Sequence, residues 1–418
     1  MSQAGKYKQW RLNEHGGDGG TFIKFSPNSQ LFVIALKRSI KIFKLDYNRF
    51  LSEEVLVYHS DFEVEDIKWS PDSKALLIIS IQCTYFVLVQ NIHKTEDLTT
   101  YRIQQPPPAK LIFIDWVPDS KCLILVSSCN IFSCVHRICD GRKILIPSIC
   151  STKEEKPLLA FSSDGKYLAS ITYHAFSYHI ALLSASLWVT LWMKKLELFI
   201  IKGLRWSQNS DMFAIWDYSK KLIFFDLNGE NVHTLHYDDP FASGFLFTLF
   251  SRNLLAATCF KDNEKVNLIL LYNLGNWQLS AILEQKFNLE SSSHLHAANK
   301  LAFSHCGNFL ASSLSDDALM LWNLKECCNP CKLTNLQHKT LQWHPRKAKF
   351  ASSAGNQIFI WECNQDGPMI KTKMYSVVTE MPSADTFVWA KKNLILQNLQ
   401  STVILVRDKE RKKFVNNS

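Results

Sequence analysis

The sequence pattern closest to a chemical site is a group of two cysteines and two histidines. Cys328 and Cys331 are followed by His338 and His344, and two thiolates with two imidazoles can hold a tetrahedral zinc ion. Only six residues separate Cys331 from His338, fewer than the usual gap in a zinc finger. His344 also stands where the chain's repeated segments carry a serine. The spacing therefore favours ordinary loop and strand residues, and we expect no metal site.

Motifs of the common enzyme classes are absent from the sequence. It contains no phosphate-binding P-loop, no Gly-x-Ser-x-Gly nucleophile turn and no paired metalloprotease histidines, each of which places reactive groups at a fixed spacing. The glycine-rich stretch Gly16–Gly20 lacks the helix pattern and the Lys or Ser/Thr that a phosphate site uses. We therefore expect a non-enzymatic protein without catalytic residues or a cofactor.

The composition is that of an ordered globular protein with a mild excess of positive charge. Hydrophobic residues make up 47% of the chain and charged residues 20%, well outside the range of disordered chains. The formal net charge of +9 would attract nucleic acid, a phospholipid surface or an acidic protein lattice such as the microtubule. Because the basic residues are dispersed rather than gathered in one stripe, the sequence does not favour nucleic acid.

Signals for secretion and for membrane insertion are also absent. The segment Met1–Arg11 is polar and lacks the apolar region of a signal peptide. We therefore expect an intracellular protein whose twelve cysteines are reduced thiols. The longest apolar run, Ile180–Met193, is too short to span a bilayer, so we expect no membrane insertion.

One short phrase recurs along the chain. It consists of an apolar residue, a variable residue, an aromatic residue, usually a serine, then a turn and a second apolar run. Clear copies read IKFSPNSQLFVIAL, IKWSPDSKALLIIS, IDWVPDSKCLILVS, LAFSSDGKYLASI, LRWSQNSDMFAIW, LAFSHCGNFLASS and LQWHPRKAKFASS, and two weaker ones read FLFTLFSRNLLAAT and FVWAKKNLILQ. The nine units begin near residues 23, 67, 114, 159, 204, 245, 301, 341 and 387.

Each phrase is anchored by its aromatic residue, and the anchors recur roughly every 45 residues, which is the period of WD repeats. A Pro-Asp-Ser or Asp-Gly turn joins two antiparallel strands in each phrase, and a third apolar strand follows. Recurrence at this period on apolar strands favours core packing over base stacking. The anchors are Phe25, Trp69, Trp116, Phe161, Trp206, Phe247, Phe303, Trp343 and Trp389.

The repeat predicts an all-β fold, a WD-repeat β-propeller of about nine units that forms one closed ring. Residues 23–408 would form the propeller, residues 1–22 an N-terminal segment and residues 409–418 a basic tail. Tyr7–Leu12 lie where they could supply the outermost strand of the last unit and so latch the ring. Because nine exceeds the usual four to eight blades, a smaller ring with extra units is the alternative. The interval after Phe247 is longer than the others, and we expect a polar loop at Asn288–Asn299.

Several segments resemble the WD-repeat protein eight family of centrosome and spindle-pole proteins. The run GLRWSQNSDMFAIWDYSKKLIFFDLNGE, from Gly203, looks like that family's fifth repeat, with Trp216 and Asp217 after the second strand rather than the third. Trp188 and Trp277 fall where the family carries a tryptophan soon after a third strand. DIKWSPDS from Asp66, LAFSHCGNFLAS and QIFIWE are further matches.

The resemblance implies a scaffold at the centrosome or spindle pole body, in the cytoplasm and cytoskeleton. There it would act with a coiled-coil anchoring partner and, in fungi, a minus-end-directed kinesin to tether microtubule minus ends and organise the spindle. It also implies association with microtubules or the gamma-tubulin complex. The sequence does not indicate which blade contacts which partner.

A second interpretation is a propeller subunit of a translation-initiation or RNA-handling complex, since large propellers also occur there. It predicts co-purification with ribosomes or RNA that depends strongly on salt. The dispersed basic residues count against it. An enzyme is the third interpretation, because propellers can host active sites, but we find no carboxylate or metal cluster that the repeats would bring together.

Overall fold

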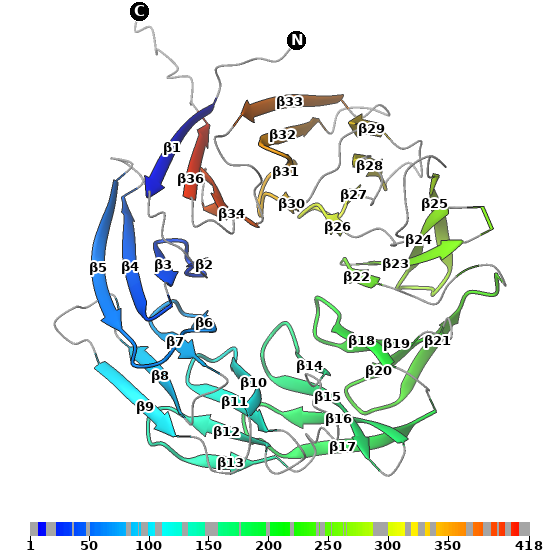
Figure 1. Ribbon diagram of the computed structural model, residues 1–418. Helices are drawn as coiled ribbons and strands as arrows, with labels where there is room; N and C mark the ends of the chain where they lie inside the picture. The colour runs from blue at the N-terminus through cyan, green and yellow to red at the C-terminus, as the bar shows by residue number, and fades with distance from the viewer. Residues whose placement is uncertain are drawn as a thin grey trace, which may run out of the picture. The chain divides into compact units, whose positions relative to one another are not determined.

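The computed structural model builds the chain from four-stranded antiparallel sheets (Figure 1). The structure describes residues 7–13, 22–35, 37–46, 51–80, 85–90, 92, 99–104, 111–127, 133–146, 158–174, 177–197, 201–217, 221–239, 242, 247–251, 253–261, 263–264, 266–286, 300–313, 319–324, 331–334, 340–364, 371–378, 386–390, 393–397 and 403–408. These residues form nine such sheets and no helix. Among them there is accordingly no helix that could cross a membrane.

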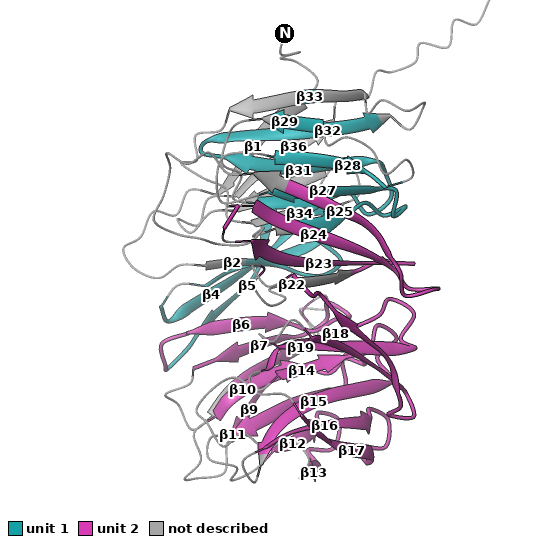
Figure 2. Cartoon of the chain, turned by 90° about the vertical axis from the view of Figure 1, so that its right-hand side faces the viewer, with its two compact units in different colours: residues 1–61, 298–418 teal, residues 62–297 magenta. Residues whose placement is uncertain are grey.

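The chain divides into two compact units, residues 1–61 with 298–418 and residues 62–297 (Figure 2). The first unit contains four sheets, which we number by their place in the repeat. Sheet 1 is β2 (Phe22–Phe25), β3 (Leu31–Ala35), β4 (Ser39–Asp46) and β5 (Leu51–His59). Sheet 7 is β26 (Lys300–Phe303), β27 (Phe309–Ser313), β28 (Leu319–Asn323) and β29 (Cys331–Thr334). Sheet 8 is β30 (Thr340–Trp343), β31 (Lys349–Ala354), β32 (Gln357–Asn364) and β33 (Lys371–Val378). Sheet 9 is β34 (Thr386–Ala390), β35 (Asn393–Gln397), β36 (Val403–Asp408) and β1 (Tyr7–Asn13).

The second unit contains five sheets in chain order. Sheet 2 is β6 (Asp66–Trp69), β7 (Leu76–Ile79), β8 (Tyr85–Gln90) and β9 (Thr99–Gln104). Sheet 3 is β10 (Leu111–Trp116), β11 (Cys122–Ser127), β12 (Ser133–Arg137) and β13 (Lys143–Leu145). Sheet 4 is β14 (Leu158–Phe161), β15 (Tyr167–His174), β16 (Ser177–Ser184) and β17 (Thr190–Leu196). Sheet 5 is β18 (Ile201–Trp206), β19 (Met212–Asp217), β20 (Lys221–Asp226) and β21 (Asn231–His236). Sheet 6 is β22 (Phe247–Phe250), β23 (Leu254–Lys261), β24 (Val266–Asn273) and β25 (Leu279–Lys286).

Where a serine follows the anchor, it closes the turn between the first two strands. In sheet 2, the Ser70 hydroxyl accepts a hydrogen bond from the Ala75 amide at 2.9 Å and donates one to Asp72 at 2.6 Å. The last turn residue, Ser73, has a left-handed backbone with φ of 65°. The same conformation recurs four residues after other anchors, and Gly165 adopts it at φ 73° without the strain that a Cβ brings. Local hydrogen bonds therefore fix this turn in each repeat where it occurs.

Tryptophan anchors also link several pairs of neighbouring sheets. The indole Nε1 of Trp116 donates a hydrogen bond to the Lys68 carbonyl at 3.0 Å, and that of Trp206 donates to the Ala160 carbonyl at 2.8 Å. In each case the acceptor is the residue just before the preceding anchor. Two more bonds of this kind lie in the first unit, from Trp343 to Ala302 and from Trp389 to Gln342.

The second strands form the centre of the hydrophobic core. All residues of β3, β7 and β11 are buried. Buried clusters join sheets 2 and 3, 3 and 4, 4 and 5, 5 and 6, and 7 and 8. Stacking of this kind lets sheets that could not bury both faces alone share a continuous core.

The N-terminal strand pairs where the sequence predicts it. β1 runs antiparallel to β36, with Tyr7 opposite Asp408 and Asn13 opposite Val403. It thereby completes sheet 9 as the fourth strand. The closed ring stays a prediction, and the expected loop Asn288–Asn299 and the basic tail lie outside the described residues.

Candidate functional site

The repeat anchors lie on the first strand of their sheets and pack inward. The tryptophan anchors are all at least nine-tenths buried, and Phe25, Phe161 and Phe303 are partly buried. The side chain of Phe247 lies outside the described residues. The buried tryptophan anchors are Trp69, Trp116, Trp206, Trp343 and Trp389. Burial of the indoles leaves none of them available to stack on a base.

Trp188 and Trp277 occupy the same position in two different sheets. Each lies in the turn between the third and fourth strands, with a left-handed backbone at φ 57° and 59°. The amide of Trp188 donates to the Ser184 carbonyl, and that of Trp277 to the Asn273 carbonyl, both at 2.8 Å. The Trp277 ring then packs on Phe224 of the preceding sheet, with ring centroids 4.6 Å apart. These two tryptophans therefore pack their turns against the preceding sheet.

Trp216 and Asp217 end the second strand of sheet 5 and are buried to 6% and 1% exposure. Trp216 lies opposite Gly203 in the strand pair. A Cβ at Gly203 would come within 2.1 Å of the Trp216 ring, so the indole fills the space that a side chain at residue 203 would need. The pair is a packing feature of β18 and β19.

Among the described residues, no group of three or more histidine, cysteine, aspartate or glutamate side chains could hold a metal ion. Cys328 and His338 lie outside these residues. His344 is buried, and its Nδ1 accepts a hydrogen bond from the Arg346 amide at 3.1 Å. It thus takes the place of the turn serine.

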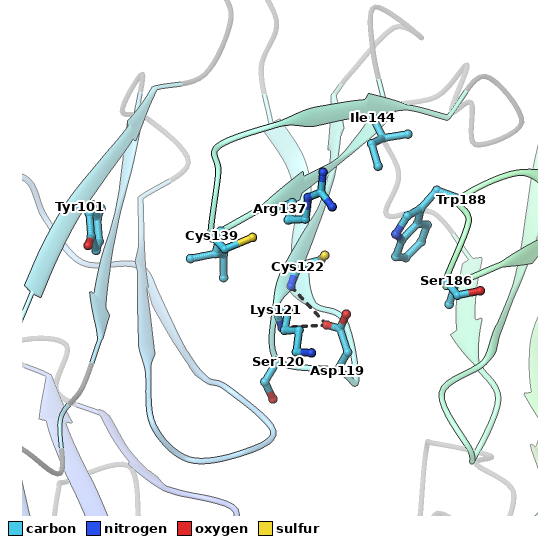
Figure 3. A pocket seen from close by; sticks show the side chains of 12 residues that line it. Tyr101, Asp119, Ser120, Lys121, Cys122, Arg137, Cys139, Ile144, Ser186 and Trp188 are labelled. Carbon is cyan, nitrogen blue, oxygen red and sulfur yellow. Dashed lines mark hydrogen bonds between the residues drawn. The ribbon is translucent and has the colours of Figure 1, made fainter.

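A hollow in the second unit lies at the ends of sheets 2, 3 and 4 and has a volume of about 560 Å³ (Figure 3). It is formed by Tyr101 of β9 together with three turns, and we call it the sheet 3 hollow. The turns contribute Asp119, Ser120, Lys121 and Cys122; Arg137, Ile138, Cys139 and Ile144; and Ala185, Ser186 and Trp188. In Figure 3 the Trp188 ring and Ile144 form one side of the hollow, and Arg137 and Cys122 lie between them and Tyr101.

The polar groups of the sheet 3 hollow hold its turns in place. Asp119 accepts hydrogen bonds from the amides of Lys121 at 2.8 Å and Cys122 at 3.2 Å. Burial, and then the Asp119 carboxylate, raise the pKa of the Cys122 thiol to about 11. The thiol is therefore protonated at neutral pH and is a poor nucleophile. Arg137 pairs with Asp140 at 2.9 Å.

A smaller hollow of about 360 Å³ occurs at the equivalent place between sheets 5 and 6. It is lined by the β18–β19 turn and by Asn253, Asn273, Leu274 and Gly275. The repeat phrases do not predict either hollow, because each hollow forms where turns from different sheets meet. The recurring tryptophan turn at Trp188 was the one sequence signal beside the larger hollow.

Comparison with known proteins places this fold. The model of the WD domain, G-beta repeat, matches residues 286–323. The structure of the eukaryotic initiation factor is 10% identical, with a TM-score of 0.60 and coverage of 88% of this chain and 91% of that one. The C-terminal WD40 domain of Sif2 is 11% identical, with a TM-score of 0.52 and coverage of 83% and 96%. This chain covers 66% of dihydro-heme d1 dehydrogenase NirN at a TM-score of 0.49 and 14% identity. No curated protein matches the chain.

The class of protein follows from the sheets and these likenesses together. The chain contains a WD40 repeat domain, and its all-β fold is that of the WD40 propellers. At these identities the similar structures show the fold alone. WD40 domains generally mediate contacts between proteins, so the fold indicates a protein-interaction scaffold.

Proposed function

We propose that this chain is a non-enzymatic WD40 scaffold at the spindle pole body or centrosome, where it helps to anchor microtubule minus ends and organise the mitotic spindle. The observation that carries the proposal is the family-like run from Gly203, in which Trp216 and Asp217 end the second strand. Trp188 and Trp277, which are also part of the resemblance to that family, have one backbone conformation and one hydrogen-bond pattern. The two tryptophans are thus one feature repeated in two sheets, which supports treating them as a signature.

The scaffold part of the proposal is supported by the character of the sheet 3 hollow. Its thiol at Cys122 is protonated, and its Arg137 is paired with Asp140, so neither group is prepared for nucleophilic chemistry. The proposed partners are a coiled-coil minus-end anchoring protein and a minus-end-directed kinesin, with association to microtubules or the gamma-tubulin complex. The proposed location is the cytoplasm and the cytoskeleton.

The test is to follow a fluorescently tagged chain through the cell cycle and to purify it from mitotic cells. We expect the tag at the spindle poles and microtubule-anchoring proteins in the purified material, with the tag alone as the control. A chain that never visits the poles would contradict the proposal. Recovery of ribosomal subunits, lost steeply as salt is raised, would instead support the translation or RNA-handling interpretation.

A further inference from the structure

Sheet 4 carries a row of exposed apolar side chains on its outermost strand. Leu187 is 70% exposed, Val189 and Leu191 are each 48% exposed, and Met193 is 55% exposed. We call these four residues the β17 ridge. They occupy alternate positions in β17 and the turn before it, and successive side chains in a strand point to opposite faces. The strand residues of the ridge, Leu191 and Met193, therefore share one face of the sheet.

The opposite face of β17 is packed against sheet 5. The Trp192 indole donates a hydrogen bond to the Leu227 carbonyl at 2.8 Å and stacks on Phe213, with ring centroids 6.1 Å apart. Leu196, on the same face as Trp192, is buried in the cluster that joins sheets 4 and 5. The β17 ridge thus lies on the face that is turned toward sheet 3.

The ridge is exposed because the outer strand of sheet 3 is short. Met193 lies opposite Ala181 in the strand pair, and Ala181 is buried against sheet 3 in a shared cluster. Further out, β13 has only three residues, whereas β17 has seven. Among the described residues, sheet 3 therefore covers the inner strands of sheet 4 but leaves the outer part of its face open.

The ridge continues into the sheet 3 hollow, whose edge is formed by Trp188 from the same turn (Figure 3). Positive charge borders both. Lys195 follows the ridge on the same face of β17, and Lys121 lines the hollow. Within the described part of the chain, neither lysine makes an ion pair. The nearby carboxylates are engaged, since Asp119 accepts two turn amides and Asp140 pairs with Arg137. An apolar surface with available ammonium groups at both ends favours an acidic, apolar ligand.

We propose that the β17 ridge and the sheet 3 hollow bind an amphipathic helix of a partner protein, in which acidic residues flank the apolar stripe. This inference rests on the proposed scaffold function. The exposed apolar surface is formed by side chains of the outermost strand and the turn before it, so the ligand packs on them as a helix does in a groove. From Leu191 to Lys195 this face of β17 is about 13 Å long, which matches roughly nine residues of helix. A second copy of this chain would bring like charges together, which disfavours self-association through this face.

The probe is a synthetic helical peptide with a leucine stripe flanked by glutamates, and its binding to the full-length chain is measured by fluorescence anisotropy. We expect the double variant Leu191→Ser/Met193→Ser to weaken binding at least tenfold. The matched control is Leu279→Ser/Ile282→Ser, which removes exposed apolar side chains from β25 and should leave binding unchanged. The charge variant Lys121→Glu/Lys195→Glu should reverse the preference toward a peptide with lysines in place of the glutamates.

Several outcomes would overturn the proposal. They are no binding of the glutamate peptide, equal binding of the glutamate and lysine peptides, and equal weakening by the β25 control. Self-association that the ridge variant abolishes would assign the face to a second copy. The purified chain is used throughout, so the binding result is independent of location in the cell. If the peptide does not bind but the tagged chain is at the spindle poles, the scaffold proposal stays intact. If the peptide binds but the tagged chain never visits the poles, only the proposed location is refuted.

Discussion

Replacing Gly203 with alanine should destabilise the second unit, because residue 203 has no room for a side chain. The added Cβ would lie 2.1 Å from one Trp216 ring atom and 2.5 Å from another, far inside contact distance. Trp216 is 6% exposed and packs in the cluster shared by sheets 5 and 6, so the ring cannot swing into solvent without opening that cluster. We expect a loss near the upper end of the range for overpacked cores, about 3 kcal/mol.

The measurement is thermal or denaturant unfolding of the full-length chain, followed by tryptophan fluorescence. A loss of about 3 kcal/mol corresponds to a midpoint lower by roughly 6 °C or more. Gly275→Ala is the control, because the nearest atom to its Cβ would be an exposed side-chain oxygen of Asn273 at 3.2 Å. Trp216→Leu should partly rescue Gly203→Ala by making room. The reasoning is refuted if both glycine variants lose the same stability, or if the leucine change simply adds its own loss.

Three further predictions concern the bond between sheets 4 and 5, the N-terminal strand and the Cys122 thiol. Trp206→Phe removes the indole bond to the Ala160 carbonyl at 2.8 Å and should lower the unfolding free energy by about 1 kcal/mol, with unchanged stability contradicting the linking role. Removal of residues 1–13 should speed hydrogen exchange in β35 and β36, because it deletes the fourth strand of sheet 9, and unchanged exchange would exclude the latch. The raised pKa of Cys122, about 11, leaves roughly one thiol in a thousand ionised at pH 8. Peptide mapping after treatment with iodoacetamide should therefore find the exposed Cys139 modified first. Cys122 should gain reactivity only as the pH rises toward its pKa. Equal labelling of both cysteines at pH 8 would contradict this.

The sequence could predict the inner half of each sheet because local rules determine it. An anchor such as Trp69, a serine and a turn residue recur in one order, and the turn closes through bonds among residues only a few positions apart. The N-terminal strand was also predictable, since the last unit lacked a fourth strand. These features depend on short-range hydrogen bonds and on alternation of apolar residues.

The outer strands and the hollows were less accessible to sequence reasoning. β13 and β17 are only partly covered and contain lysines among their apolar residues, so they lack the continuous apolar run of a core strand such as β11. The Trp188 side chain is buried in the cluster that sheet 4 shares with sheet 3, a tertiary contact that no local pattern encodes. The sheet 3 hollow depends on which turns of neighbouring sheets meet, a tertiary property.

This division between inner and outer strands also predicts which substitutions affect folding and which affect binding. Phe213 on β19 is fully buried and stacks on Trp192, so Phe213→Ala should lower stability by about 3 to 5 kcal/mol. Met193 follows Trp192 in the chain, but its side chain lies on the opposite face of β17 and is 55% exposed. Met193→Ser should therefore change stability by no more than about 0.5 kcal/mol. If Met193→Ser instead lowers the unfolding midpoint as Phe213→Ala does, the ridge is already covered within the chain. In that case it is part of the core and is not a surface that a partner can reach.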